Sequence, residues 1–303
     1  MSKIVPIDRD IRIVGWDIDD TLVPEMEPKT SALEQMTMAL SHATKIPFEE
    51  IQRSIGRVFE RRGTDYHYLI QELDCFEDYL EKHGKSAEDR RLARFELVEI
   101  GKKWWGKARD RYPREIKGVR TVLKTLIDNG IKNFALSNAT LDQACRRLNG
   151  ANLFEYFTLV GGVRSEINKT FPDLSPVLVD LGYLGDKRKQ QVVDKSKPDT
   201  DLAEFLAMSP EEIEKHVVFV GDSESDMKLM KKYKAYRMKA NYNRPDEYVK
   251  IRFRRFSTPE LEAKFKAQEK AEKNNGMVSN DELDIPVDDV MDIPKYIIPA
   301  RKK

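Results

Sequence analysis

The chain has 303 residues, of which 40% are hydrophobic and 35% charged, and its formal net charge is +1. This length allows one large domain or two modest ones with a buried core. Because 53 basic residues nearly balance 52 acidic ones, the composition excludes a strong global field toward polyanions, and we expect no nucleic acid or membrane as a partner.

The N-terminal sequence and the cysteines indicate the cellular compartment of the protein. The first ten residues lack the apolar run of a secretory signal, and no apolar stretch approaches the ~18 residues of a membrane-spanning helix. Cys75 and Cys145 lie far apart in segments that we predict to be helical, which fits unpaired thiols in a reducing compartment. We therefore expect a soluble, cytoplasmic protein.

The chain begins with a strand that is followed by a long helical segment. Residues 11–16 form a short apolar run that leads into acidic residues, which is typical of a buried parallel strand ending at a functional loop. Between about residues 33 and 111, apolar side chains such as Ile51, Ile55 and Val58 recur at helical spacing. We assign residues 25–113 to an inserted all-helical domain.

Beyond residue 113, helical and strand patterns alternate. This alternation predicts an α/β fold with a doubly wound parallel sheet, formed by residues 1–24 and 114–256. The predicted elements are a helix over 119–127, a strand over 131–136, a helix over 141–149, a strand over 156–163, helices near 199–207 and from 209, and a strand over 216–220.

Two segments carry little periodicity. We interpret residues 164–196 as a surface insertion. Residues 257–303 contain a charged helical candidate and an acidic, proline-containing stretch without a wide apolar face. We expect this C-terminal segment to be a charged tail, partly disordered, outside the core.

Two acidic clusters follow the first and the last predicted strand. Asp17, Asp19 and Asp20 belong to the first cluster, and Asp222 and Asp226 to the second. Because parallel strands present their carboxyl ends at one edge, we expect the two clusters to meet there. Such carboxylates would repel one another without a cation, and a set of oxygen ligands favours Mg²⁺.

Simpler interpretations exist for these carboxylates. Acidic residues after strands often serve as helix caps or turn formers. An EF-hand calcium loop is a sharper alternative, but it requires glycine at its sixth position and glutamate at its twelfth. Here these positions hold Leu22 and Pro28, so that alternative fails.

Further polar residues lie where a phosphate site would need them. Ser137 and Asn138 end a predicted strand, and Lys197 precedes a helix with a cation that could meet phosphate. Each also has an ordinary interpretation, since Ser137 and Asn138 could cap a helix and Lys197 could be a solvated lysine. Their order and placement together favour the phosphate site.

Four segments together resemble the motifs of a known superfamily. DIDDT at residues 17–21, Ser137-Asn138, Lys197 in KPD and GDSESD at 221–226 occur in the order of the four motifs of the haloacid dehalogenase (HAD) superfamily. The resemblance covers residues 11–240 and implies a Rossmann-like core. The helical segment resembles the cap domain of phosphoglycolate phosphatase-like members.

The resemblance also implies roles for the motif residues. Asp17 would be the nucleophile that forms an aspartyl-phosphate, and Asp19 the general acid and base. Mg²⁺ would be held by Asp17, by the backbone carbonyl of Asp19 and by Asp222, with Asp226 in its outer shell. The residues expected to bind the phosphate oxygens are Ser137, Asn138 and Lys197.

One departure from the family pattern keeps the lysine assignment open. The segment before Lys197 is longer than usual, so Lys187, Lys189 and Lys195 remain alternatives. Asp19 argues against a true dehalogenase, because those members lack a carboxylate at this position.

We expect a Mg²⁺-dependent phosphatase that acts on a small phosphomonoester, such as a metabolite or nucleotide. A phosphomutase of the same fold uses the same aspartyl-phosphate and is the first alternative. A non-catalytic binding or scaffold protein is the second. The sequence leaves open whether the protein forms a homo-oligomer.

Overall fold

The structure is a computed structural model that describes residues 6–62, 67–109, 111–112, 114–163, 187–242, 247–264, 266–267 and 283–298. The chain divides into two units. The core unit comprises residues 1–24, 113–244 and 280–303, and the helical unit comprises residues 25–112 and 245–279.

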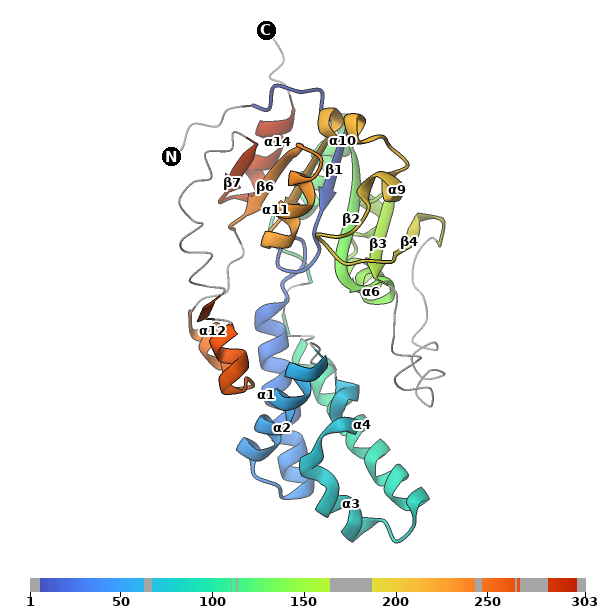
Figure 1. Cartoon of the computed structure of the whole chain (residues 1–303), viewed down its shortest axis with the longest axis vertical. Helices are drawn as coiled ribbons and strands as arrows, with labels where there is room; N and C mark the ends of the chain where they lie inside the picture. Colours follow the sequence, from blue (N-terminus) through green and yellow to red (C-terminus); the bar gives the residue numbers. More distant parts are fainter. Residues whose placement is uncertain are drawn as a thin grey trace. The chain divides into compact units, whose positions relative to one another are not determined.

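Seven parallel strands form the sheet of the core unit, in the order β4-β3-β2-β1-β5-β6-β7 (Figure 1). The order runs outward from β1 in both directions, which confirms the predicted doubly wound α/β fold. The strands are β1 (Ile13–Trp16), β2 (Lys132–Thr140), β3 (Leu159–Val163), β4 (Gln190–Val193), β5 (Val217–Gly221), β6 (Tyr236–Ala240) and β7 (Asp284–Val287).

Apolar side chains cover both faces of this sheet, as a buried parallel sheet requires. Val14 and Trp16 of β1 belong to one buried cluster, and Phe134 and Phe219 belong to another. The first cluster includes residues of α5 (Val119–Asp128), α6 (Leu141–Gly150) and α14 (Ile293–Ile297), and the second includes residues of α9 (Leu202–Leu206), α10 (Pro210–His216) and α11 (Glu224–Lys231). Short 3₁₀ turns are η3 (Phe154–Tyr156), η5 (Lys187–Lys189) and η6 (Val290–Asp292).

Gly15 interrupts the apolar run of β1 for a steric reason. Its neighbours Phe134 and Phe219 have ring centroids 5.9 Å apart. A Cβ atom on residue 15 would lie 2.3 Å from one ring and 2.4 Å from the other. Because real Cβ atoms do not approach so closely, glycine lets the two rings pack across the central strand.

The helical unit contains helices and 3₁₀ turns throughout its described residues. Its longest helices, α1 and α4, pack against each other. A Cβ on Gly101 of α4 would lie 2.1 Å from Ile70 of η1 and 3.4 Å from Met36 of α1. Trp105 of α4 is buried. The elements are α1 (Met26–Thr44), α2 (Phe48–Arg62), η1 (His67–Glu72), η2 (Asp74–Phe76), α3 (Glu77–His83), α4 (Ala87–Arg109) and α12 (Glu247–Arg254).

The helix α12 lies in the helical unit, whereas the sequence interpretation placed residues up to 256 in the core. The guanidinium of Arg252 binds the carboxylate of Glu34 on α1, with one nitrogen–oxygen distance of 3.0 Å. The ring of Phe253 meets that of Phe59 edge-on, with centroids 5.8 Å apart. Sequence order alone does not reveal that the chain returns to this unit.

The C-terminal segment also differs from the expectation of a tail outside the core. β7 pairs with β6 as the seventh strand of the sheet, and α14 follows it (Figure 1). Their apolar side chains are few and are separated by acidic residues and prolines, so the sequence shows no broad apolar face. The residues that are nevertheless buried are Val287, Val290, Ile293 and Ile297.

Part of the predicted surface insertion also contributes to the sheet. β4 lies within residues 164–196 and pairs with β3 at the edge of the sheet. Its sequence, QQVV, is too short and too polar to give a clear strand pattern. The rest of the expectation for this insertion concerns residues 164–186, which lie outside the described residues.

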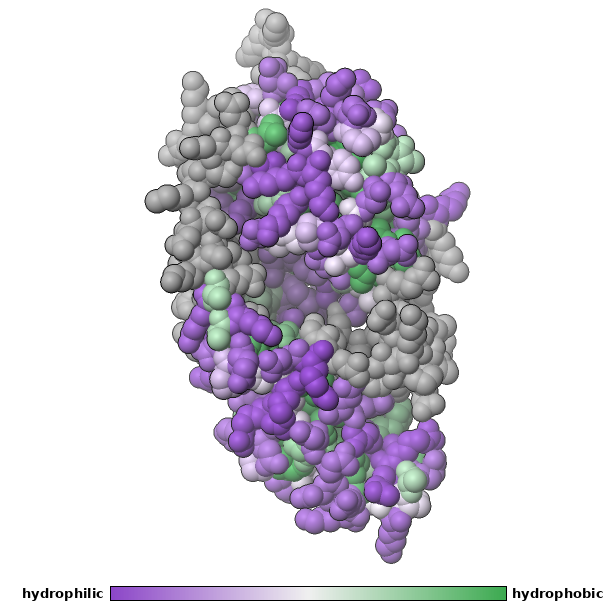
Figure 2. All heavy atoms as spheres, in the orientation of Figure 1, coloured by the Kyte–Doolittle hydropathy of each residue, from purple (hydrophilic) through white to green (hydrophobic). Residues whose placement is uncertain are grey.

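The face shown in Figure 2 is mostly hydrophilic, with small apolar areas on both units. This agrees with the 35% of charged residues in the chain. In the part of the chain that the structure describes, every helix is too short or too polar to cross a membrane.

Candidate active site

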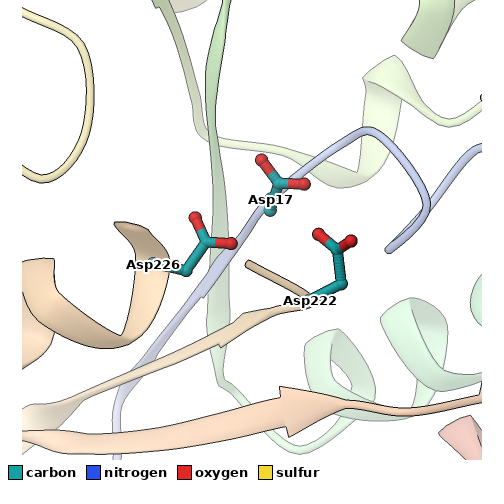
Figure 3. A group of neighbouring side chains, drawn as sticks. All are labelled: Asp17, Asp222 and Asp226. Atoms are coloured by element: carbon teal, nitrogen blue, oxygen red, sulfur yellow. The ribbon is translucent and has the colours of Figure 1, made fainter. Parts of the chain in front are cut away.

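The two acidic clusters meet at the carboxyl edge of the sheet. Asp17 follows β1 and Asp222 follows β5, and these two strands are neighbours. The backbone N–H of Asp17 donates to the carbonyl of Val220 at 2.9 Å, which continues the pairing to the edge. Carboxylate oxygens of Asp17, Asp222 and Asp226 all lie within 4.8 Å of one another, and Figure 3 shows the three side chains converging.

A tight turn directs the first cluster into this site. The backbone N–H of Leu22 donates to the carbonyl of Ile18 at 2.9 Å, and that of Asp20 donates to the carbonyl of Val23 at 2.8 Å. Asp20 has φ 55°, in the left-handed region that aspartate tolerates better than most residues. The turn begins directly beyond Asp17, so the chain reverses within a few residues of the sheet edge.

Lys197 is the cation at the centre of the cluster. Its Nζ forms ion pairs with Asp17 and with Asp226, the latter at 2.5 Å, and its side chain is 1% exposed. Burial opposes the charged ammonium, but Asp17 and Asp226 outweigh that effect and raise the pKa of Lys197. Lys195, one of the alternatives, is exposed. The structure thus brings Lys197 to the acidic cluster.

Asp226 has a second task at the start of α11. Its Oδ2 accepts hydrogen bonds from the backbone N–H and the hydroxyl of Ser223, at 3.0 and 2.5 Å, within a capping box. A Cβ on Gly221 would lie 2.4 Å from this oxygen, so glycine permits the close approach. Because Lys197 binds the other oxygen, Asp226 is held from both sides.

Asp17 and Asp222 are the carboxylates that burial destabilises. Burial, and then the charges of Asp226 and Asp20, raise the pKa of Asp222 to about 7. Burial also raises the pKa of Asp17 well above its usual value, although Lys197 opposes the shift. Among the described residues Asp222 has no ion-pair partner. A hard divalent cation would relieve this repulsion, and the purely carboxylate donor set fits Mg²⁺.

Ser137 and Asn138 lie at the carboxyl end of β2. The backbone N–H of Lys197 donates to Oδ1 of Asn138 at 2.7 Å, which ties the lysine loop to β2. This leaves the Nδ2 group of Asn138 as a donor. Ser137 is 1% exposed, and its hydroxyl oxygen accepts from the backbone N–H of Ala139 at 3.0 Å.

Sequence reasoning missed Arg147. This arginine lies on α6, and its Nη1 forms an ion pair with Oδ2 of Asp19. Nothing in the spacing of the motifs indicates it, because an arginine within an amphipathic helix is usually a solvated residue.

Sequence reasoning also missed Tyr242, which follows β6. Its hydroxyl donates to the carbonyl of Thr21 at 3.1 Å, which holds the turn beyond Asp17. Burial, then the charges of Asp222 and Asp17, raise the pKa of this phenol, so it remains a donor. Its position just after a strand at the same sheet edge was the available signal.

No family model matches the chain, and no curated protein matches it either. Several solved structures are similar to it. YfnB of Bacillus subtilis, provisionally assigned as a HAD-hydrolase and bound to magnesium, is 14% identical over 96% of this chain and 100% of its own, with a TM-score of 0.46. A provisionally assigned phosphoglycolate phosphatase of Lactobacillus delbrueckii is 14% identical over 96% of this chain and 100% of its own, with a TM-score of 0.45.

A provisionally assigned β-phosphoglucomutase of Thermotoga maritima is 17% identical over 81% of this chain and 97% of its own, with a TM-score of 0.39. At such low identities, the roles of individual residues depend on the geometry of this chain. The chain is thus similar to solved structures described as a HAD-hydrolase and a phosphoglycolate phosphatase.

Proposed function

We propose that the chain is a Mg²⁺-dependent phosphatase that hydrolyses a small phosphomonoester through an aspartyl-phosphate on Asp17. The observation that carries this proposal is the convergence of Asp17, Asp222 and Asp226 within 4.8 Å at the carboxyl edge of the sheet, with Lys197 buried against two of them. Holding carboxylates so closely costs stability through their repulsion, and such costs are typical of functional sites.

Asp17 attacks phosphorus in the first half of the reaction. Its carboxylate oxygen forms a bond to phosphorus while the bond from phosphorus to the leaving oxygen breaks. Asp19 donates a proton to that leaving oxygen, so an alcohol departs. Lys197, Ser137 and the amide of Asn138 bind the equatorial phosphate oxygens, where negative charge is spread in the transition state.

Water completes the reaction in the second half. Asp19, now a carboxylate, accepts a proton from a water molecule whose oxygen attacks phosphorus. The bond between phosphorus and the Asp17 oxygen then breaks, which releases inorganic phosphate and restores the carboxylate. Each proton that Asp19 gives in the first half is therefore recovered in the second.

Asp17, Asp222 and the backbone carbonyl of Asp19 would hold Mg²⁺, with Asp226 in its outer shell. The ion would supply charge neutralisation between the nucleophile and the phosphate dianion. Asp226 suits the outer position because its oxygens already bind Lys197 and Ser223. We place this chemistry in the cytoplasm, where the free thiols of Cys75 and Cys145 would remain reduced.

The test is turnover of p-nitrophenyl phosphate and a panel of metabolite phosphates with Mg²⁺, followed by addition of EDTA. We expect turnover that EDTA abolishes and that Asp17→Asn eliminates. A phosphoryl group on the wild-type protein should be released by hydroxylamine, as an acyl phosphate is. The matched control is Asp10→Asn, which removes an exposed carboxylate just before β1.

The outcomes separate the proposal from its alternatives. Activity that appears only with a bisphosphate primer would indicate a phosphomutase with the same nucleophile. Turnover that survives Asp17→Asn would show that the assigned nucleophile is wrong. No turnover of any phosphate, with no phosphoprotein formed, would favour a binding or scaffold protein.

A further inference from the structure

Arg147 reaches the catalytic edge because of the direction of α6. This helix begins at Leu141, directly after β2 ends at the edge that holds Ser137 and Asn138. Arg147 lies six residues further on, or about 9 Å along the helix axis. Long side chains in helices point back toward the N-terminus, so the guanidinium returns toward the sheet edge.

The guanidinium meets one specific carboxylate there. Its Nη1 pairs with Oδ2 of Asp19, and the two side chains are 12% and 29% exposed. A charge-assisted hydrogen bond between such partly buried side chains is stronger than one between fully exposed side chains. Lys197 binds Asp17 and Asp226. The two cations thus contact different carboxylates.

The backbone of Asp19 is held in the tight turn beyond β1, but its carboxylate needs a contact of its own to keep one orientation. It lies beyond the end of β1 and is joined to Val23 by a single isolated bridge. A general acid must keep its oxygen within hydrogen-bond reach of the leaving group, and a looser site loses rate. Arg147 binds Oδ2 of the carboxylate, which restrains the orientation of the Asp19 side chain.

We propose that Arg147 is a positioning residue that orients Asp19 toward the leaving-group oxygen. This inference rests on the proposed phosphatase function and adds to it a residue outside the four motifs. Arg147 acts through Asp19 rather than on the phosphate itself.

The test uses para-substituted phenyl phosphates whose leaving groups differ in basicity but not in size near phosphorus. A p-nitrophenolate ion departs without a proton, whereas more basic phenolates need one. The measured quantity is kcat/KM, which reports the steps up to departure of the leaving group. We expect Arg147→Gln to lower kcat/KM at least about 10-fold more for phenyl phosphate than for p-nitrophenyl phosphate.

Three further variants define the role. Arg147→Lys keeps the charge and should restore part of the loss. Asp19→Asn should show the same dependence on the leaving group, and adding Arg147→Gln to it should cause no further loss. Arg146→Gln removes the neighbouring charge from the same helix and should leave the dependence as in the wild type.

Equal losses for all leaving groups, or losses of Arg147→Gln and Asp19→Asn that multiply in the double variant, would overturn the proposal. If Arg147→Gln does not fold by circular dichroism, the comparison is made with Arg147→Lys, and an unchanged dependence on the leaving group there overturns it. Failure of the proposed phosphatase function would give a different result. In that case the wild-type protein would hydrolyse no phosphate ester, or the Asp17→Asn variant would remain active.

Discussion

Lys197 and Asp226 form an ion pair of 2.5 Å in which both side chains are buried, at 1% and 0% exposure. The same Nζ binds Asp17. One cation therefore joins Asp17, the proposed nucleophile after β1, to the first turn of α11. Because α11 follows the loop that carries Asp222, the geometry of the acidic site and the packing of the core depend on the same contact.

Replacing Lys197 should therefore destabilise the fold and abolish activity. Lys197→Met leaves Asp17 and Asp226 buried without their shared cation. Removing one partner of a buried ion pair costs on the order of 3 kcal/mol. We expect a loss of this size in urea denaturation of the metal-free protein. Lys195→Met, which changes an exposed lysine of the same loop, is the control and should have wild-type stability and activity.

Mg²⁺ should stabilise the wild-type protein against heat. A ligand present at about 100 times its dissociation constant adds about 2.7 kcal/mol to the free energy of unfolding. For a domain of this size, that corresponds to a rise in Tm of roughly 5–10 °C. Asp222→Asn should lose most of the shift in differential scanning fluorimetry. An equal shift in that variant would mean that Mg²⁺ binds elsewhere.

The stability of the metal-free protein should fall as pH rises. Burial, together with the charges of Asp226 and Asp20, raises the pKa of Asp222 from 3.8 to about 7 in the folded state. Between about pH 4 and pH 7 the folded state therefore binds more protons at this group than the unfolded state does. Its contribution to the free energy of unfolding is present below pH 4 and is lost as pH rises to 7.

Urea denaturation with EDTA at pH 5 and pH 8 measures this effect. The decrease between the two pH values should be smaller in Asp222→Asn than in the wild type. Asp10→Asn should behave like the wild type, because Asp10 is exposed. A decrease of the same size in all three proteins would exclude Asp222 as its source.

The sequence predicted the elements that carry strong local signals. Asp17 and Asp222 each follow an apolar strand, and parallel pairing brought both to one edge, as that pattern indicated. Arg147 and Tyr242 were missed because their roles arise from contacts across the fold. An arginine in an amphipathic helix carries no spacing signal of its own, and the position of Tyr242 after a strand does not show which group its hydroxyl contacts.

The C-terminal segment was misjudged for a different physical reason. Its strand is short and contains a proline, and its buried residues are spread over separate short elements. The composition of this segment suggested disorder. A few apolar side chains are nevertheless enough to order it, because its strand pairs with the edge of β6 and its carboxylate pairs with a buried charge there. Arg237 of β6 is that charge, since it is 1% exposed and pairs with Asp284 of β7.

Removing Asp284 should therefore destabilise the core unit even though it lies in the last part of the chain. Asp284→Ala takes away an ion-pair partner of the buried Arg237, at a cost on the order of 3 kcal/mol. We expect a corresponding decrease in the urea midpoint with an unchanged m-value. Lys295→Ala breaks an exposed pair with Asp292 in the same segment and should leave the midpoint unchanged. Wild-type stability in Asp284→Ala would show that β7 adds little to the sheet, and truncation before residue 280 would then be tolerated as well.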